Sequence, residues 1–168
     1  MRALVKLVDY DPAWPAKFAA EKDLLSQWLR PWLFGPIEHV GSTAVPGLRA
    51  KPVIDIMVGV ETLAASRDAI AVLQDRGYQY WDYKSDVMHW FCKPSDEFRT
   101  HHLHLVPLTS ELWRARLAFR DYLRRESGTA AEYVVLKDRL AKEFRHDREA
   151  YTEGKREFVE RVVAQALE

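Results

Sequence analysis

Residues 37–60 read IEHVGSTAVPGLRAKPVIDIMVGV, two apolar segments separated by a loop rich in glycine and hydroxyl groups. The first segment, 37–40, leads into Gly41-Ser42-Thr43, and the second, 53–59, carries Asp55 in its middle. Short apolar runs bounded by glycine and proline are typical of strands. Glycine lets a backbone approach a phosphate closely, and neighbouring hydroxyl and N–H groups can bind that phosphate. We therefore expect two strands joined by a phosphate-binding loop, with a carboxylate beside it.

The rest of the chain alternates between helical and strand-like apolar patterns. The expected elements are a strand or arm at 4–8, a helix from Asp11-Pro12 to about Pro31, a helix from Thr62 to Gly77, strands at 78–83, 87–92 and 102–107, a helix capped by Ser110, a helix capped by Thr129 and Glu132, and a last helix at 151–166 with Gly154 as its weak point. This order predicts an α+β fold: a mixed or antiparallel sheet of about four to five strands, helices packed on it, and a C-terminal helical segment. Because the chain has 168 residues and no linker-like segment, we expect a single domain, 1–168.

The composition argues against several classes of function. Lys and Arg together number 25, as do Asp and Glu, and this balance argues against a broad nucleic-acid surface. No apolar run approaches the ~20 residues that span a bilayer, which argues against a membrane protein. The single Cys92 and the lack of a signal-peptide pattern lead us to expect a cytoplasmic protein. Six tryptophans exceed what a small core needs, so we also expect a homo-oligomer interface.

The run GSTAVPGLRAKPVIDI at 41–56 resembles the signature of the GrpB family, which is related to the nucleotidyltransferase (polymerase-beta-like) superfamily. The resemblance continues at 77–78, 102–106, 119–123 and 151–155, so it covers nearly the whole chain. It implies a nucleotidyltransferase-like core and a nucleotidyltransferase activity. It names no substrate.

Asp55 is the first candidate for a catalytic or metal-binding role, because an ionised carboxylate on a buried strand is costly unless it is paired or metal-bound. The alternative is an ion pair with Lys51, Arg49 or a helix arginine. The resemblance implies a pair of acids two residues apart on this strand, but Met57 occupies the second position. A two-metal phosphoryl-transfer centre needs several carboxylates, and this segment offers one.

His102 and His104 are expected to complete a metal site. Residues two apart on a strand face the same side, and neighbouring strands lie ~4.8 Å apart. If their strand lies beside Asp55, the three side chains suit one transition-metal ion, whereas Mg²⁺ prefers oxygen ligands. The alternative is that one histidine lies in the core or at the surface and the other only forms a hydrogen bond. His101 would point to the other face, and His39 is a weaker addition.

Several basic residues are candidate phosphate contacts. Lys51 is expected either to neutralise a phosphate in a catalytic role or to pair with Asp55. Arg99, beside the histidine strand, and Lys84, in the preceding loop, are candidate contacts to a polyphosphate, although each alone is more often a solvated charge.

Other polar residues near these motifs have plain structural explanations. Ser42 and Thr43 are expected to serve as helix caps, as phosphate ligands, or as both. Lys137, Tyr151 and Lys155 lie on the predicted helical tail, where Tyr151 and Lys155 share one helical face. Ion pairs between helices account for that spacing, so we assign these three residues no catalysis.

Two functions fit these features. The first is a nucleotidyltransferase that binds a nucleotide phosphate at Gly41-Ser42-Thr43 and a divalent metal, Mg²⁺ or a transition metal, at Asp55 with His102 and His104. Its acceptor is unknown. The second is a non-catalytic domain that binds a nucleotide or another small phosphorylated ligand. Met57 supports this second function, and relatives fused to dephospho-coenzyme A kinase imply a regulatory role near coenzyme A metabolism.

Overall fold

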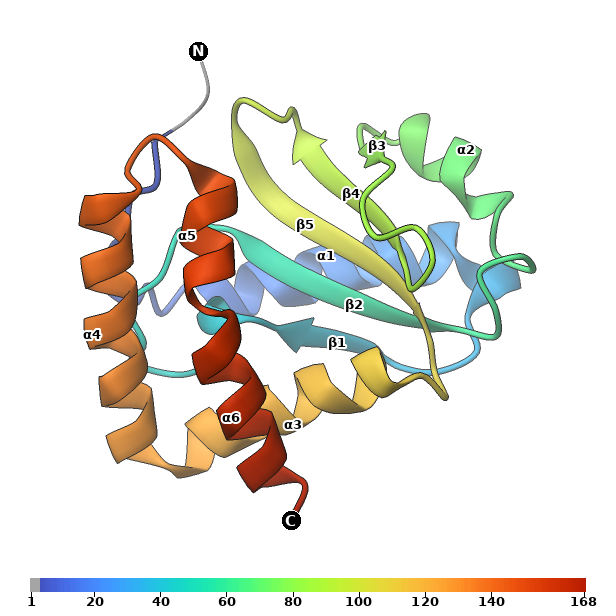
Figure 1. Ribbon diagram of the computed structural model, residues 1–168. Helices are drawn as coiled ribbons and strands as arrows, with labels where there is room; N and C mark the ends of the chain where they lie inside the picture. The colour runs from blue at the N-terminus through green and yellow to red at the C-terminus, as the bar shows by residue number, and fades with distance from the viewer. Residues whose placement is uncertain (1–3) are drawn as a thin grey trace.

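The computed structural model describes residues 4–168, which form a five-stranded sheet with helices on both faces (Figure 1). The elements are, in chain order, α1 (Trp14–Trp28), the short 3₁₀ helix η1 (Arg30–Trp32), β1 (Ile37–Val40), the 3₁₀ helix η2 (Ser42–Ala44), β2 (Ile54–Val60), α2 (Ala69–Gln74), β3 (Gln79–Trp81), β4 (His89–Pro94), β5 (Arg99–Pro107), α3 (Glu111–Arg125), α4 (Ser127–Glu143), α5 (Arg148–Gly154) and α6 (Arg156–Ala166). The expected α+β architecture with a helical C-terminal segment is confirmed.

The sheet is mixed, with strand order β1-β2-β5-β4-β3. Only β2 and β5 run parallel, and the other three neighbouring pairs are antiparallel. The chain between these two central strands contains α2, β3 and β4, so β5 returns beside β2 from a distant part of the sequence. The parallel register pairs Asp55 with His102 and Met57 with His104. This register places Asp55 of the first motif directly beside the two histidines of β5.

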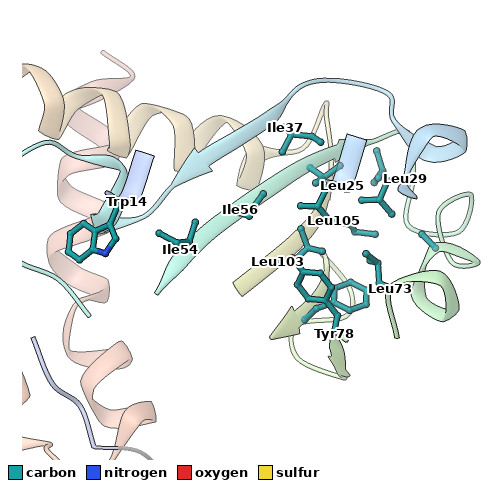
Figure 2. Close-up of a cluster of buried hydrophobic side chains, with 14 of the residues drawn as sticks. Trp14, Leu25, Leu29, Ile37, Ile54, Ile56, Leu73, Tyr78, Leu103 and Leu105 are labelled. Atoms are coloured by element: carbon teal, nitrogen blue, oxygen red, sulfur yellow. The ribbon is translucent and has the colours of Figure 1, made fainter. Parts of the chain in front are cut away.

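One face of the sheet is apolar and packs on α1 and α2. Figure 2 shows Ile54 and Ile56 of β2 and Leu103 of β5 in this cluster, where they pack with Leu25 of α1 and with Leu29, the residue after this helix. These strand residues alternate with Asp55, His102 and His104, because successive side chains of a strand point to opposite faces. The apolar face therefore holds the sheet to its helices and fixes which residues face the other way.

The other face is covered partly by α3 and carries the polar residues. Val40, Met57 and Val106 pack there against Trp113 of α3. The Ser110 side chain accepts a hydrogen bond of 3.2 Å from the Trp113 N–H, so the predicted cap of this helix is confirmed. From α3 the chain continues into α4, α5 and α6, which stand beside the end of the sheet where the loop before β2 lies (Figure 1).

The last predicted helix is divided at its glycine. Helix α5 ends at Gly154 and α6 begins at Arg156. A Cβ atom at Gly154 would lie 2.5 Å from Leu140 Cδ2, so a larger residue here would force the Leu140 side chain of α4 to move. The break at this weak point places Tyr151 and Lys155 near Lys51, in the loop before β2.

Several predicted boundaries are wrong for local reasons. Residues 63–68 form turns rather than helix, and within them the Ser66 hydroxyl donates to the Thr62 carbonyl. Helix α4 starts at Ser127, so Thr129 lies inside the helix and does not cap it. The segment at 4–8 forms no extended strand: its backbone is held by the bridge between Val8 and Ala50 and by a hydrogen bond from the Val5 N–H to the Arg145 carbonyl. None of the helices within residues 4–168 combines the length and apolar character needed to cross a bilayer.

Candidate functional site

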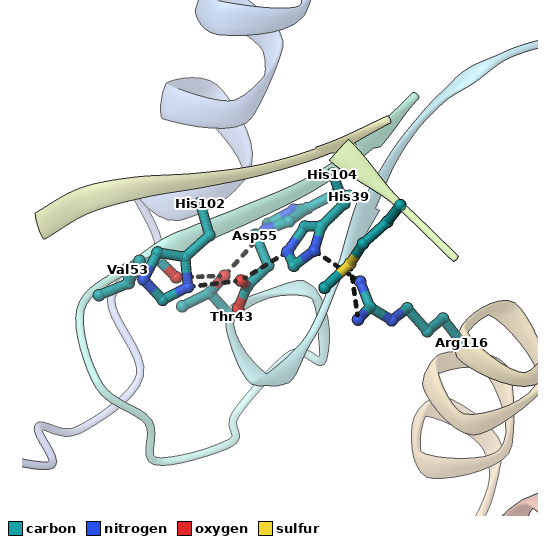
Figure 3. A network of polar contacts seen from close by, with 8 residues as sticks. His39, Thr43, Val53, Asp55, His102, His104 and Arg116 are labelled. Carbon is teal, nitrogen blue, oxygen red and sulfur yellow. Dashed lines mark hydrogen bonds and ion pairs between the residues drawn. The ribbon is translucent and has the colours of Figure 1, made fainter. Parts of the chain in front are cut away.

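Asp55 lies between the two histidines, as their spacing predicts (Figure 3). Its Oδ1 atom is 3.0 Å from His102 Nδ1 and 3.4 Å from His104 Nε2. Burial would raise the pKa of Asp55, but the two histidines outweigh it and hold that pKa well below its ordinary value. The carboxylate is therefore ionised and only accepts, so both rings donate to it. With 28% of its side chain exposed, Asp55 remains accessible from solvent.

The alternative of an arginine or lysine partner for Asp55 is not what the structure shows. Arg49 pairs instead with Asp9 and Asp138. Within residues 4–168, the ion-pair contacts of Asp55 are those with the two histidines. The charge of Lys51 is consequently available to another anion.

Arg116 of α3 fixes the proton on His104. Its guanidinium lies 2.8 Å from His104 Nδ1 and also contacts the sulfur of Met88 (Figure 3). Because arginine only donates, Nδ1 accepts and the ring proton is on Nε2, which points to Asp55. Burial, together with the nearby Arg116 charge, lowers the pKa of His104 to about 3, so the ring is neutral.

The donor set at Asp55 does not fit a two-ion centre. His104 Nε2 carries a proton in this arrangement and has no lone pair for a metal. Met57, at the position of the second acid, is fully buried among apolar side chains. Within residues 4–168, no group of three or more His, Cys, Asp or Glu side chains is arranged to hold a metal ion. The metal site of Asp55, His102 and His104 stays a prediction.

His102 differs from His104 in having one unused ring nitrogen. Its Nδ1–H donates to Asp55, which leaves the lone pair on Nε2. That Nε2 atom is buried and makes no hydrogen bond with residues 4–168. Trp90 packs beside the ring, with ring centres 5.2 Å apart. His102 is thus held by Asp55 and Trp90 on one side and unpaired on the other.

The glycine of the loop lies directly against the Asp55 carboxylate. Gly41 has a φ of 73°, in the left-handed region that favours glycine. A Cβ atom at this position would lie 2.6 Å from Asp55 Oδ2, so a side chain would collide with the carboxylate. Glycine therefore brings the backbone of the predicted phosphate-binding loop beside the predicted catalytic acid.

The two hydroxyl residues of the loop point to different surroundings. Ser42 Oγ lies 3.0 Å from Lys137 Nζ, on the side of the helical tail. Thr43 is buried, and its hydroxyl lies 2.9 Å from His39 Nε2 and 3.3 Å from the carbonyl of Val53 (Figure 3). Because the carbonyl only accepts, Thr43 donates to Val53 and accepts from His39. Its hydroxyl bonds therefore stabilise the loop, while Ser42 faces the candidate site.

Three lysines converge on this loop, from the segment before β2, from α4 and from the α5–α6 junction. Lys51 Nζ and Lys155 Nζ lie over the ring of Tyr151, at 5.0 and 4.5 Å from its centre. Lys137 Nζ lies 4.7 Å from the ring centre of Tyr133. We refer to Lys51, Lys137 and Lys155 as the lysine cluster.

Burial changes the protonation of the lysine cluster. It lowers the pKa of Lys137 to about 7. Burial also lowers the pKa of Lys155 to about 7, with further contributions from the charges of Lys51 and Lys137, while Asp55 opposes the change. The pKa of Lys51 is lowered as well, again chiefly by burial. These mutual effects mean that the three ammonium groups and Asp55 share one electrostatic environment.

From sequence alone, Lys137 and Lys155 are expected to form ion pairs between helices, and this is wrong: within residues 4–168 neither pairs with a carboxylate, and the structure places both at the site. Their contact with the loop depends on how α4 and α5 pack, which spacing along the helices does not reveal. One sequence feature could have pointed to Lys155: the Tyr151-x-x-x-Lys155 pattern lies in a segment that resembles the family. Arg116 carries no such signal.

The two other predicted phosphate contacts lie in different places. Arg99 packs on the ring of Trp90, 5.0 Å from its centre, and pairs with Asp96. Its charge contributes to the lowered pKa of Lys51, although burial is the larger cause, so it borders the site. Lys84 lies in an exposed loop and contacts the ring of Tyr83. The phosphate-binding roles of Arg99 and Lys84 stay predictions.

A separate cavity of roughly 310 Å³ lies on the α1 side of the same loop. Its lining includes Phe18, His39, Thr43 and Arg124. The rings of Phe18 and His39 are stacked with centres 4.8 Å apart, and burial lowers the pKa of His39 to about 4. The Arg124 side chain donates to the carbonyl of Ala44. His39 therefore belongs to this cavity and not to the Asp55 cluster.

Comparison with solved structures shows proteins of similar fold. The chain is similar to Cid1, in a complex with its short product ApU, with a TM-score of 0.53 and 14% identity over 80% of this chain and 42% of that one. At this identity the likeness concerns the fold alone. A dephospho-CoA kinase of Mycolicibacterium paratuberculosis is 28% identical over 89% of this chain, which corresponds to 43% of that protein.

Other relatives match almost the full chain. A UPF0157 protein of Pseudomonas aeruginosa is 41% identical over 97% of this chain and 68% of its own length. The crystal structure of the conserved protein GrpB from Enterococcus faecalis superimposes with a TM-score of 0.87 and 32% identity, covering 96% of this chain and 97% of that one. The family model described as GrpB protein matches residues 4–165. The chain therefore belongs to the GrpB family.

Proposed function

We propose that the protein binds the phosphate groups of a nucleotide at Gly41-Ser42-Thr43 and transfers the nucleotidyl group to an acceptor. The observation that carries this proposal is the contact of Gly41 with Asp55, since it joins the loop backbone to a partly exposed, ionised carboxylate. The fold supports the proposal, because the sheet and its helices share the architecture of a nucleotidyltransferase.

Each residue of the site has a role in this proposal. Ser42 and the lysines near it contact the phosphates, because hydroxyl and ammonium groups form strong hydrogen bonds with anionic oxygens. The acceptor group attacks the α-phosphorus of a nucleoside triphosphate and loses its proton, the bond from that phosphorus to the bridging oxygen breaks, and pyrophosphate leaves. Asp55, oriented by His102, lies beside this reacting phosphorus. Catalysis depends on positioning and on charge neutralisation, as in phosphoryl transfer generally. The divalent ion expected at Asp55, His102 and His104 stays a prediction, and the assay treats it as a variable.

A transfer assay tests the proposal directly. Purified protein is incubated with each labelled nucleoside triphosphate and a pool of small metabolites, with Mg²⁺, Mn²⁺, Zn²⁺ or EDTA. We expect labelled product, and at least about a 100-fold loss of rate in Asp55→Asn, the scale on which loss of one electrostatic catalytic group acts. Asp75→Asn is the matched control, because Asp75 is an exposed acid at the end of α2. Absence of transfer by the unchanged protein under all these conditions would remove the catalytic part of the proposal.

Met57 favours a second candidate function, binding without transfer. Its side chain fills the apolar cluster under α3 at the position where a second acid is expected. In this case the protein would respond to a nucleotide or a coenzyme A precursor and regulate a partner, in line with the similarity to a dephospho-CoA kinase. Thermal shift by these compounds in EDTA, with no product formed, would favour this function. Product formation would favour the first.

A further inference from the structure

We propose that the site binds a chain of linked phosphates through the lysine cluster without requiring a divalent ion. The ligand class is a triphosphate, carried by a nucleotide or present as inorganic polyphosphate. This inference rests on the proposed function for the location of the site. It adds which groups neutralise the ligand, and it concerns binding rather than transfer.

The ammonium groups of the lysine cluster come from separate parts of the chain and lie close to the Gly41-Ser42-Thr43 loop. Lys137 reaches the loop itself, since its Nζ lies 3.0 Å from Ser42 Oγ and also donates to the carbonyl of Arg49 at 2.5 Å. Lys51 and Lys155 meet over a single ring, that of Tyr151. One cation therefore lies at the loop and two lie next to it, an extended arrangement that suits several linked phosphates better than one.

The lysine cluster has no carboxylate partner of its own within the described part of the chain. The ion pairs found within residues 4–168 involve other basic groups, and none joins a carboxylate to one of these three ammonium groups. Lys93 shows the usual arrangement for a half-buried lysine, because its Nζ lies 2.5 Å from Glu21 Oε1. Three desolvated cations repel one another, and a polyanion relieves that repulsion.

Two tyrosine rings hold the ammonium groups in position. Tyr151 and Tyr133 are both buried, and their rings attract the cations above them by cation–π interaction. The rings thus stabilise the lysines without neutralising them, which leaves their charge for a ligand. A pre-arranged cationic site loses little side-chain entropy on binding.

The balance of charge around Asp55 also favours a ligand bound without a metal. Two-metal sites hold their ions with several carboxylates, and even a single Mg²⁺ at a triphosphate site uses one or two carboxylates together with the phosphates. Here Asp55 stands alone, and Met57 replaces the second acid. Asp138, whose charge also acts on Lys137, is paired with Arg49, so the three lysines still leave an excess of positive charge over Asp55. The protein itself therefore supplies the positive charge that a metal ion supplies in other sites.

Calorimetric titration with inorganic triphosphate at pH 7 in excess EDTA tests this inference. We expect saturable binding with one site per chain, and binding of inorganic monophosphate at least tenfold weaker. Lys137→Met and Lys155→Met should each weaken triphosphate binding by tenfold or more. Lys142→Met is the matched control on the same helix, because Lys142 is exposed, and it should bind as the unchanged protein does. Titration of a nucleoside triphosphate then distinguishes a nucleotide ligand from inorganic polyphosphate.

The variant Asp55→Asn provides a second test, in which triphosphate affinity should not fall as it does in the lysine variants. This test remains valid even if the lysine variants do not fold. Removing a negative charge from a metal-free cationic site should leave triphosphate binding in EDTA unchanged or up to about fivefold tighter. Weaker binding by this variant, or binding that appears only when Mg²⁺ is added, would overturn the inference. If transfer fails while binding in EDTA follows these expectations, the proposed activity is wrong and this inference stands. If transfer occurs but triphosphate does not bind in EDTA, the proposed activity stands and the inference of metal-free binding is wrong.

Discussion

The two faces of β2 and β5 consist of alternate residues of the same two strands. One face stabilises the sheet, and the other carries the polar residues of the candidate site. On one face Ile54, Ile56 and Leu103 pack against α1 in a hydrophobic cluster. On the other face Asp55 and His102, their immediate neighbours in sequence, form a partly exposed polar cluster. The apolar face stabilises the sheet and sets its register, and that register aligns the polar residues across two strands.

A sheet with two such faces can carry reactive groups at little cost in stability. A shift of one residue in the pairing would turn Asp55 into the apolar cluster and Ile56 out of it. The energy of the apolar face opposes any such shift, because each fully buried aliphatic side chain contributes about 1.5–3 kcal/mol. Changes on the first face should therefore affect stability, and changes on the second should affect ligand binding.

The largest effect on stability is expected on the apolar face. Ile56→Ala removes a fully buried side chain and leaves a cavity, so the free energy of unfolding should fall by about 2–4 kcal/mol. Chemical denaturation measures this loss, with Val135→Ala, an exposed position on α4, as a control that should change little. The protein that remains folded should bind triphosphate normally. A loss of affinity in the folded variant would contradict the separation of the two faces.

The next effect is expected at the loop that meets the polar face. Gly41→Ala should lower the free energy of unfolding by about 1–3 kcal/mol and weaken triphosphate binding, because the added Cβ would meet Asp55 Oδ2 at 2.6 Å. Gly47→Ala is the matched control. Gly47 has a φ of 80°, and a Cβ atom added there would meet no atom within 4 Å, so this variant has backbone strain without the collision. Equal binding defects in both variants would show that contact with Asp55 is irrelevant.

The effect of pH is expected on binding alone, through the lysines on the polar side. The pKa values of Lys137 and Lys155 are about 7, so both are mostly charged below pH 7 and become neutral above it. A neutral amine does not attract phosphate, so affinity for triphosphate should fall from pH 7 to 9, by about tenfold for each lysine. Titrations in EDTA across this range measure the slope, and Lys137→Met should make it shallower. Affinity that stays constant or rises would contradict the role of these lysines.

The sequence correctly predicts which side chains lie on the polar face of the sheet. It does not predict which residues from distant helices pack around them. Alternation along 53–59 and 102–107 places Asp55, His102 and His104 on one side, and the parallel pairing of β2 and β5 bears this out. Periodicity is a local property, so it predicts which side chains share a face. The α+β architecture follows in the same way from the order of the elements.

The remaining features depend on contacts between distant segments. Arg116 sets the proton on His104 only because α3 crosses that face, and the lysine cluster exists only because α4 and α5 pack against the loop. Thr43 has the same hydroxyl chemistry as its neighbour Ser42, but its side chain is turned to His39. The single domain 1–168 and the homo-oligomer stay predictions, because neither concerns a contact within this sheet.

A crystal structure with a non-hydrolysable nucleoside triphosphate tests most directly whether the loop, Asp55 and the lysine cluster form one phosphate site. We predict that the phosphates lie between Gly41-Ser42 and the ammonium groups of Lys51, Lys137 and Lys155. A nucleotide whose phosphates occupy the cavity beside Phe18 and Arg124 instead, on the opposite side of the loop, would contradict this account of the site.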